Sequence, residues 1–206
     1  MKFNQLDKFK YVSFDVFDTL LFRKVKTPMG LFEYIQNEAE KKGFSFPNFC
    51  KARIQAEKIA IKHNSESDEI TLDSIYNEME FNSPAKRNYF ENLEKESEIL
   101  LCEPNIEMVS LLNQLKSKGK VILITSDMYL SSDTISKMLK TCGICYDYLY
   151  VSSEYGVRKS SGKLFKKILA DLHINRNELV HIGDNWKSDY LMPKLVRISS
   201  IYYKNK

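Results

Sequence analysis

The sequence has no apolar run approaching the roughly 18 residues that a membrane-spanning helix needs. Its first residues are polar, so we expect no signal peptide and a cytoplasmic protein. The 31 basic side chains barely exceed the 27 acidic ones, and no long Lys/Arg run argues for nucleic acid as a partner. The chain also lacks repeats and low-complexity segments, so its 206 residues suit a soluble globular core domain with an insertion.

Cysteine is scarce, with four residues in the chain. Cys142 and Cys145 have the C-x-x-C spacing of zinc and redox motifs. A zinc site would need two more ligands at close spacing, and the sequence offers none. We therefore interpret these residues as reduced thiols that pack beside a helix ending at Gly143.

The regular elements predict an α/β fold with a doubly wound, mostly parallel, Rossmann-like sheet. Several β-like runs are nearly continuous in apolar residues, as expected of parallel strands covered on both faces. Amphipathic helical patterns separate the later runs. The expected strands are Tyr11 to Phe14, Val121 to Thr125, Tyr148 to Val151, Leu179 to Ile182 and an edge strand near Ile198 to Tyr202. The expected helices are Ile106 to Lys118, a helix capped near Ser131 that runs to Thr141, and Leu164 to Leu172.

The stretch from Val25 to Glu103 differs from the rest, since it shows helical periodicity and no strand alternation. Asn82-Ser83-Pro84 marks a turn, and Pro84 suits the first turn of a helix. We predict an all-helical cap domain over 25–103, inserted into a core domain of 1–24 and 104–206. One alternative is that this insertion only enlarges the hydrophobic core. Its place directly after Asp15 favours a lid instead.

Acidic and hydroxyl side chains follow three of the predicted strands. Asp15 follows the first strand, Ser126 and Asp127 end the second, and Asp184 and Asp189 follow the fourth. A buried carboxylate costs several kcal/mol unless a partner compensates, so a nucleophilic or metal-binding role explains Asp15 better than a structural one. Ligands of open α/β sheets bind at these strand ends. A loop before the fourth strand carries Lys159, which can reach the same edge.

These residues, in this order, resemble the four motifs of the haloacid dehalogenase (HAD) superfamily. The resemblance implies Asp15 as nucleophile, Ser126 as the hydroxyl of the second motif and Lys159 as the lysine of the third. Gly183, Asp184 and Asp189 match the fourth motif, Gly-Asp-x-x-x-x-Asp. The insertion lies where this family places a type 1 cap. The resemblance thus implies a hydrolase acting on a small phosphorylated metabolite. Lys163 competes with Lys159, but the spacing favours Lys159.

Charge predicts a metal at this edge. Unit charges about 4 Å apart repel by roughly 4 kcal/mol at an effective dielectric near 20, so three carboxylates would exclude a phosphate ester. Mg²⁺ removes this conflict, because it binds carboxylate oxygens and retains water. We expect Asp15, Asp184 and the Phe17 backbone carbonyl as direct ligands, and Asp189 through water. Asp184 can alternatively cap a helix through Lys187.

Phe17 departs from the phosphatases of the family, which carry a general acid–base aspartate at this position. Three explanations stand: Asp18 supplies the proton, the cap or substrate supplies it, or the enzyme is a dehalogenase or phosphonatase. We favour a phosphatase, because a dehalogenase would not need a metal. A non-catalytic binding module is a further alternative.

Two further residues are candidates for substrate binding. Asp127 follows Ser126, and Arg23 follows the first loop; each can meet the substrate or merely shape the surface. Two segments resemble a bacterial branch of this superfamily that is found with surface-polysaccharide genes. They are Phe-Asp-x-Phe-Asp-Thr-Leu-Leu and Ser-Asp-Met-Tyr-Leu. That resemblance suggests a phosphorylated sugar or amino alcohol from polysaccharide biosynthesis as substrate.

Overall fold

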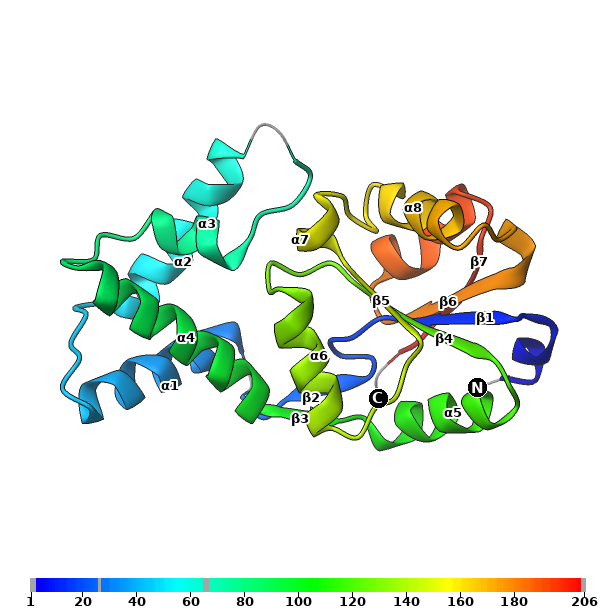
Figure 1. The fold of residues 1–206 in the computed structure, drawn as a ribbon, viewed down its shortest axis with the longest axis horizontal. Coiled ribbons are helices and arrows are strands. Elements are labelled where there is room, and N and C mark those ends of the chain that lie inside the picture. The colour runs from blue at the N-terminus through cyan, green and yellow to red at the C-terminus, as the bar shows by residue number, and fades with distance from the viewer. Residues whose placement is uncertain (1–2, 26, 65–66, 205–206) are drawn as a thin grey trace.

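The computed structural model describes residues 3–25, 27–64 and 67–204. It has an α/β part built around a sheet and a helical insert that extends to one side of it (Figure 1). The strands are β1 (Tyr11–Phe14), β2 (Leu21–Arg23), β3 (Cys102–Pro104), β4 (Val121–Ser126), β5 (Tyr148–Val151), β6 (Leu179–Gly183) and β7 (Ser199–Tyr202). The α-helices are α1 (Pro28–Lys41), α2 (Phe49–His63), α3 (Leu72–Asn77), α4 (Pro84–Leu100), α5 (Ile106–Ser117), α6 (Ser132–Thr141), α7 (Ser152–Tyr155), α8 (Lys163–Asp171) and α9 (Met192–Leu195). Short helical turns are η1 (Phe3–Lys8), η2 (Arg176–Glu178) and η3 (Trp186–Leu191), the last a π-helix.

The main sheet has five parallel strands in the order β5-β4-β1-β6-β7. The predicted parallel sheet is thereby confirmed. β1 lies at its centre, with Phe14 opposite Ile124 on one side and Ile182 on the other. Because β1 ends there, the following residue, Asp15, emerges between the ends of two neighbouring strands.

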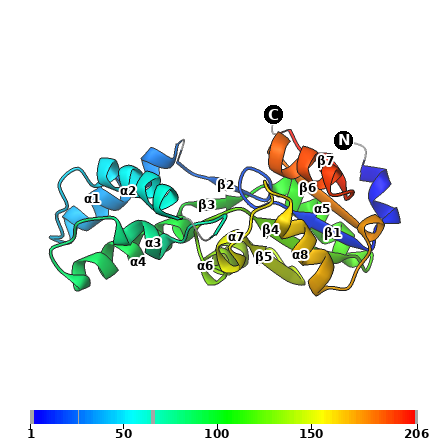
Figure 2. The ribbon, with the colours of Figure 1, turned by 90° about the horizontal axis from the view of Figure 1, so that it is seen from above.

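Helices cover both faces of this sheet, which explains the nearly continuous apolar strands (Figures 1 and 2). Leu123 of β4 packs in a cluster with Phe165 and Ile168 of α8. Its neighbours Ile122 and Ile124 belong to a larger cluster that includes residues of α5 and α6. Successive side chains of a strand point to opposite faces of the sheet, so this one short apolar run packs against the helices on both faces. No described helix combines the length and apolar character needed to cross a bilayer.

Helices α1 to α4 form the insert after β1, as predicted. Ser83 caps α4 by accepting a hydrogen bond from the Lys86 amide, and Pro84 occupies the first turn. Inside the insert, Arg53 and Glu94 form an ion pair at 2.7 Å, with both side chains fully buried. This pair joins α2 to α4.

Two strands were not predicted. β2 and β3 pair antiparallel and link the insert to the sheet-bearing part. β3 begins at Cys102, so the prediction that 25–103 is all-helical is wrong at its C-terminal end. Each strand has only three residues, too few to show alternation, and each is stabilised by a partner distant in sequence.

The C-x-x-C residues do not form a joint site. Cys142 follows the end of α6, and its Sγ lies 3.6 Å from the Sγ of Cys102 on β3. All four cysteines are free thiols. Gly143 has a φ of +70°, which suits glycine after a helix end.

Candidate active site

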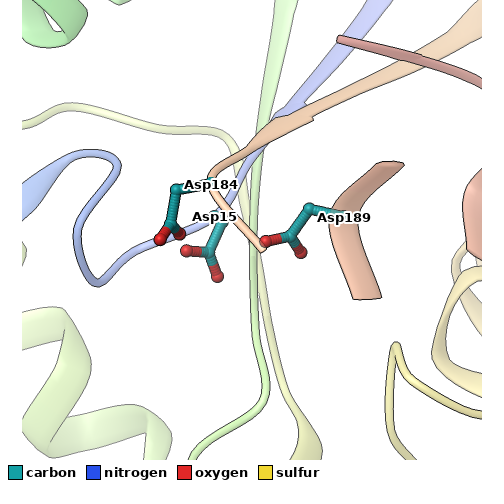
Figure 3. Close-up of side chains that lie close together, drawn as sticks. All are labelled: Asp15, Asp184 and Asp189. Carbon is teal, nitrogen blue, oxygen red and sulfur yellow. The ribbon is translucent and has the colours of Figure 1, made fainter. Parts of the chain in front are cut away.

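Three carboxylates converge at the carboxyl edge of the sheet. Asp15 follows β1, Asp184 follows β6, and Asp189 lies on η3 (Figure 3). Each offers one oxygen atom, and these oxygens all lie within 4.8 Å of one another. The strand order brings Asp15 and Asp184 together, because β1 and β6 are hydrogen-bonded neighbours.

The local turn after β6 holds Asp189 in place. The side chain of Asn185 accepts hydrogen bonds from the Lys187 and Ser188 amides, so Asn185, rather than Asp184, caps the turn. Asp189 Oδ2 in turn accepts a hydrogen bond from the Asn185 amide at 3.0 Å. A Cβ at Gly183 would lie only 2.5 Å from Asp189 Cγ. The close approach of this carboxylate to β6 therefore requires glycine at 183.

Lys159 lies between two of these carboxylates. Its Nζ donates to Asp15 Oδ1 at 2.5 Å and to Asp189 Oδ1 at 2.6 Å, and the residue is 2% exposed. Asp127 positions the loop that carries Lys159, called the lysine loop below. Its carboxylate accepts hydrogen bonds from the Lys159 and Ser160 amides at 2.6 and 3.2 Å. The competing Lys163 is on the surface and pairs with Asp68.

The surroundings shift the pKa values of the carboxylates in opposite directions. Burial raises the pKa of Asp15 to about 7, although the Lys159 ammonium opposes this effect. Burial also lowers the pKa of Lys159, but Asp15 and Asp189 outweigh it, so its pKa is raised and the amine is protonated. For Asp189 burial raises the pKa, while Lys159 more than offsets it, and the pKa lies well below its usual range. Burial and Asp189 raise the pKa of Asp184.

Behind the carboxylates lies a buried polar chain. His181 Nε2 is 3.1 Å from Asp189 Oδ1, and His181 Nδ1 is 2.9 Å from the Ser13 hydroxyl. That hydroxyl is 2.8 Å from the hydroxyl of Thr125. Burial lowers the pKa of His181, although Asp189 opposes this effect. The ring therefore connects the interior of the sheet to Asp189.

The predicted residues around the carboxylates line one cavity of about 360 Å³. It contains Ser126, Asp127, Phe17 and Asp18 beside the three aspartates and Lys159. Asp18 has a φ of +56°, a left-handed conformation that Asp tolerates better than most residues.

Arg23 is separate from this group. Its Nε and Nη2 each lie 3.2 Å from a carboxylate oxygen of Glu98, which is buried. Its guanidinium lies 4.1 Å from the centre of the Phe17 ring. Arg23 lines a neighbouring cavity and not the one that contains Asp15.

One residue of the insert that the sequence did not indicate contacts the lysine loop. Glu69, between α2 and α3, is 7% exposed. Its carboxylate pairs with Arg158 at 2.5 Å and accepts a hydrogen bond from Ser152 at 2.6 Å. Glu69 comes close to the lysine loop only in the folded chain, so its position in the sequence gave no indication of this contact.

Comparison with known proteins gives one family match and many structural ones. The family described as haloacid dehalogenase-like hydrolase matches residues 9–196. No curated protein matches the chain. A 2-haloacid dehalogenase from Pseudomonas syringae pv. Tomato DC3000 has a TM-score of 0.70 and 13% identity, covering 95% of this chain and 86% of that one.

Two further solved structures show the same fold. A HAD phosphatase from Thermococcus onnurineus has a TM-score of 0.64 and 18% identity, covering 95% of this chain and 86% of that one. The magnesium-bound HAD-hydrolase YfnB from Bacillus subtilis has a TM-score of 0.61 and 16% identity, with 95% and 88% covered. These similarities establish the fold of this chain.

Proposed function

The chain belongs to the haloacid dehalogenase-like hydrolase family, whose match spans residues 9–196, and within it we propose an Mg²⁺-dependent phosphatase. The proposed enzyme hydrolyses a small phosphate monoester through an aspartyl-phosphate at Asp15. One observation carries the proposal: Asp15, Asp184 and Asp189 present oxygens within 4.8 Å of one another beside a buried, protonated lysine.

The donor set fits a hard divalent cation. Carboxylate oxygens are the ligands Mg²⁺ prefers, and it usually retains several waters. Asp15 and Asp184 would bind it directly, with the Phe17 backbone carbonyl. Both oxygens of Asp189 already accept hydrogen bonds from protein groups, so Asp189 would act through water. When bound, Mg²⁺ would supply positive charge that lets the phosphate approach the carboxylates and that stabilises charge in the transition state.

Phosphoryl transfer needs a nucleophile and groups that stabilise the transferred phosphoryl group, and residues of the cavity supply both. An Asp15 carboxylate oxygen attacks phosphorus as the bond from phosphorus to the alcohol oxygen breaks. Lys159 balances the charge that gathers on the phosphoryl oxygens, and the Ser126 hydroxyl donates a hydrogen bond to one of them. Water then attacks phosphorus, restoring the Asp15 carboxylate and releasing phosphate.

A proton donor is needed at the leaving oxygen, and Phe17 cannot supply it. Asp18 lines the same cavity, one residue further along the turn. We assign it the acid–base role: it protonates the departing alkoxide and later takes a proton from the attacking water. Asp127 contributes by holding the lysine loop through two backbone amides.

The insert completes the proposed enzyme as a type 1 cap over 25–103, on a core of 1–24 and 104–206. Its contacts through Glu69 with the lysine loop support a lid role. A cytoplasmic location is part of this proposal. The resemblance to a surface-polysaccharide branch suggests a phosphorylated sugar or amino alcohol within the substrate class. Arg23 is a candidate for contact with the leaving group.

A phosphate-release assay on a panel of phosphate monoesters, with Mg²⁺ and with a chelator, tests the proposal. We expect release only with Mg²⁺. Halide release from 2-haloacids in the presence of chelator would instead identify a dehalogenase, and phosphate release from phosphonates alone would identify a phosphonatase. Tight Mg²⁺ binding without turnover on any substrate would identify a binding module.

A further inference from the structure

A second cavity, of about 430 Å³, lies between the insert and the segment after β4. Its size is in the range of pockets that hold small molecules, roughly 300–1,000 Å³. Most of its lining is apolar. The apolar side chains are Met29, Leu31 and Phe32 of α1, Ile54 and Ile61 of α2, and Met128 after β4.

This cavity adjoins the one that contains the carboxylates. Phe17 lines the carboxylate cavity and Arg23 lines the second, and the two side chains are stacked at 4.1 Å. Asp127 lines the first cavity, and the next residue, Met128, lines the second. The two cavities therefore meet at Phe17 and Arg23, and a leaving group attached to a phosphate on Asp15 would pass this pair to enter the apolar cavity.

Most charges in the wall of the second cavity are already paired. Arg23 is held by Glu98 through two hydrogen bonds. Glu57 pairs with Arg53 at 3.0 Å. Lys58, the remaining charged lining residue, is exposed to solvent. The Thr27 hydroxyl accepts a hydrogen bond from the Gly30 amide at 3.3 Å. The Tyr129 hydroxyl and Lys58 are therefore the main polar groups of the wall left to bind the hydroxyls of a leaving group.

We propose that this cavity binds the leaving group of the substrate, and that this group is an apolar alcohol of about the size of an aromatic ring. The inference rests on the proposed phosphatase function, and it favours an apolar alcohol over the sugar that the surface-polysaccharide resemblance suggests. A polyhydroxylated leaving group would lose hydrogen bonds to water on entry, whereas an apolar one gains from leaving water. The stacked pair of Arg23 and Phe17 offers a flat surface against which a ring can pack.

Three substrates distinguish the contributions of the two cavities, because they share a phosphoryl group and differ in the leaving group. Acetyl phosphate has a small leaving group, phenyl phosphate an apolar ring and glycerol 3-phosphate a polar chain. Phenol is a better leaving group than an alkyl alcohol, which raises kcat whatever the cavity binds, so the comparison rests on KM. We expect KM for phenyl phosphate to be about tenfold lower than that for glycerol 3-phosphate, because the apolar ring gains from leaving water.

A matched pair of variants localises the effect. Ile54 and Ile59 are both half-buried on α2, but Ile54 lines this cavity while Ile59 lines a separate one within the insert. Ile54→Asn should lower the ratio of kcat/KM for phenyl phosphate over acetyl phosphate about fivefold. Ile59→Asn should leave that ratio unchanged. Circular dichroism of both variants checks that they fold.

Binding to the wild-type protein gives a test independent of folding and turnover. With Mg²⁺ present, calorimetry should show phenylphosphonate binding about tenfold more tightly than methylphosphonate. Equal affinities, equal KM values for phenyl and glycerol phosphates, or an unchanged ratio in a folded Ile54→Asn variant would overturn the inference. Absence of phosphate release from all three substrates would refute the phosphatase instead, and the phosphonate comparison would still decide what the cavity binds.

Discussion

His181 and Asp189 form a buried pair, with Nε2 of the imidazole 3.1 Å from Oδ1 of the carboxylate. The other ring nitrogen lies 2.9 Å from the Ser13 hydroxyl, so both nitrogens have partners. Asp189 would hold Mg²⁺ through water, and residues behind such a group orient it and tune the affinity for the metal. We therefore assign His181 a positioning role: it fixes Asp189, which in turn contacts Lys159.

Replacing His181 by Leu should raise the Mg²⁺ concentration needed for half-maximal activity by about 10- to 100-fold, the effect typical of lost outer-shell partners. Loss of its hydrogen bonds should also lower the melting temperature. A titration of phosphatase activity with Mg²⁺ measures the first effect. His63→Leu, at an exposed histidine on α2, is the control. An unchanged Mg²⁺ requirement in a destabilised His181 variant would reduce the role to packing.

Asp18→Asn should reduce kcat by about 10²- to 10⁴-fold, because general acid–base catalysis has that magnitude. Asn tolerates the positive φ at this position, so the turn is retained. The loss should be greatest for substrates with poor leaving groups and small for acetyl phosphate. Comparison of the two substrate types measures this difference. A variant with wild-type kcat on both would show that the proton comes from elsewhere.

Glu69→Ala should lower kcat/KM about tenfold, since small displacements of a positioned group can cost up to about 10² in rate. The substitution removes the ion pair with Arg158, the neighbour of Lys159. Steady-state kinetics on a fixed substrate measures the loss. Glu80→Ala, an exposed position of the insert, should have wild-type kinetics. If the two variants behave alike, the Glu69 contact does not control the lysine loop.

Arg53→Met should destabilise the protein by about 3–5 kcal/mol, because it leaves the buried Glu94 carboxylate without its cation. The Tyr76 hydroxyl, 2.8 Å from Glu94, cannot replace that charge. Adding Glu94→Leu should recover most of the loss, since paired removal of buried charges is often neutral. Denaturant unfolding of the single and double variants measures both effects. A single variant as stable as wild type would contradict the buried pairing.

The sheet could be predicted because its signals are local. Each core strand is an apolar run of four to six residues, and the order of motifs along the chain placed Asp15, Ser126 and Asp184 at strand ends. The topology then brings these ends together, as the rule for open α/β sheets requires. The helices of the insert were visible for the same reason, through their periodicity.

The unpredicted features depend on distant partners. β2 and β3 exist because residues about 80 positions apart pair, and neither strand is long enough to show a pattern. Glu69 and the pairing of Arg23 with Glu98 depend on how the insert lies against the rest. The capping role of Asn185 in place of Asp184 is a matter of side-chain orientation that spacing alone does not specify.

Transfer of phosphate to Asp15 is the central claim, and rapid acid quenching with ³²P-labelled phenyl phosphate tests it most directly. With Mg²⁺ present, we predict an alkali-labile label on the peptide that contains Asp15, with a stoichiometry approaching one per chain. Asp15→Asn should carry no label and release no phosphate, while Asp133→Asn, at an exposed aspartate of α6, should match wild type. Steady phosphate release by the Asp15→Asn variant, or label on another residue, would contradict the mechanism.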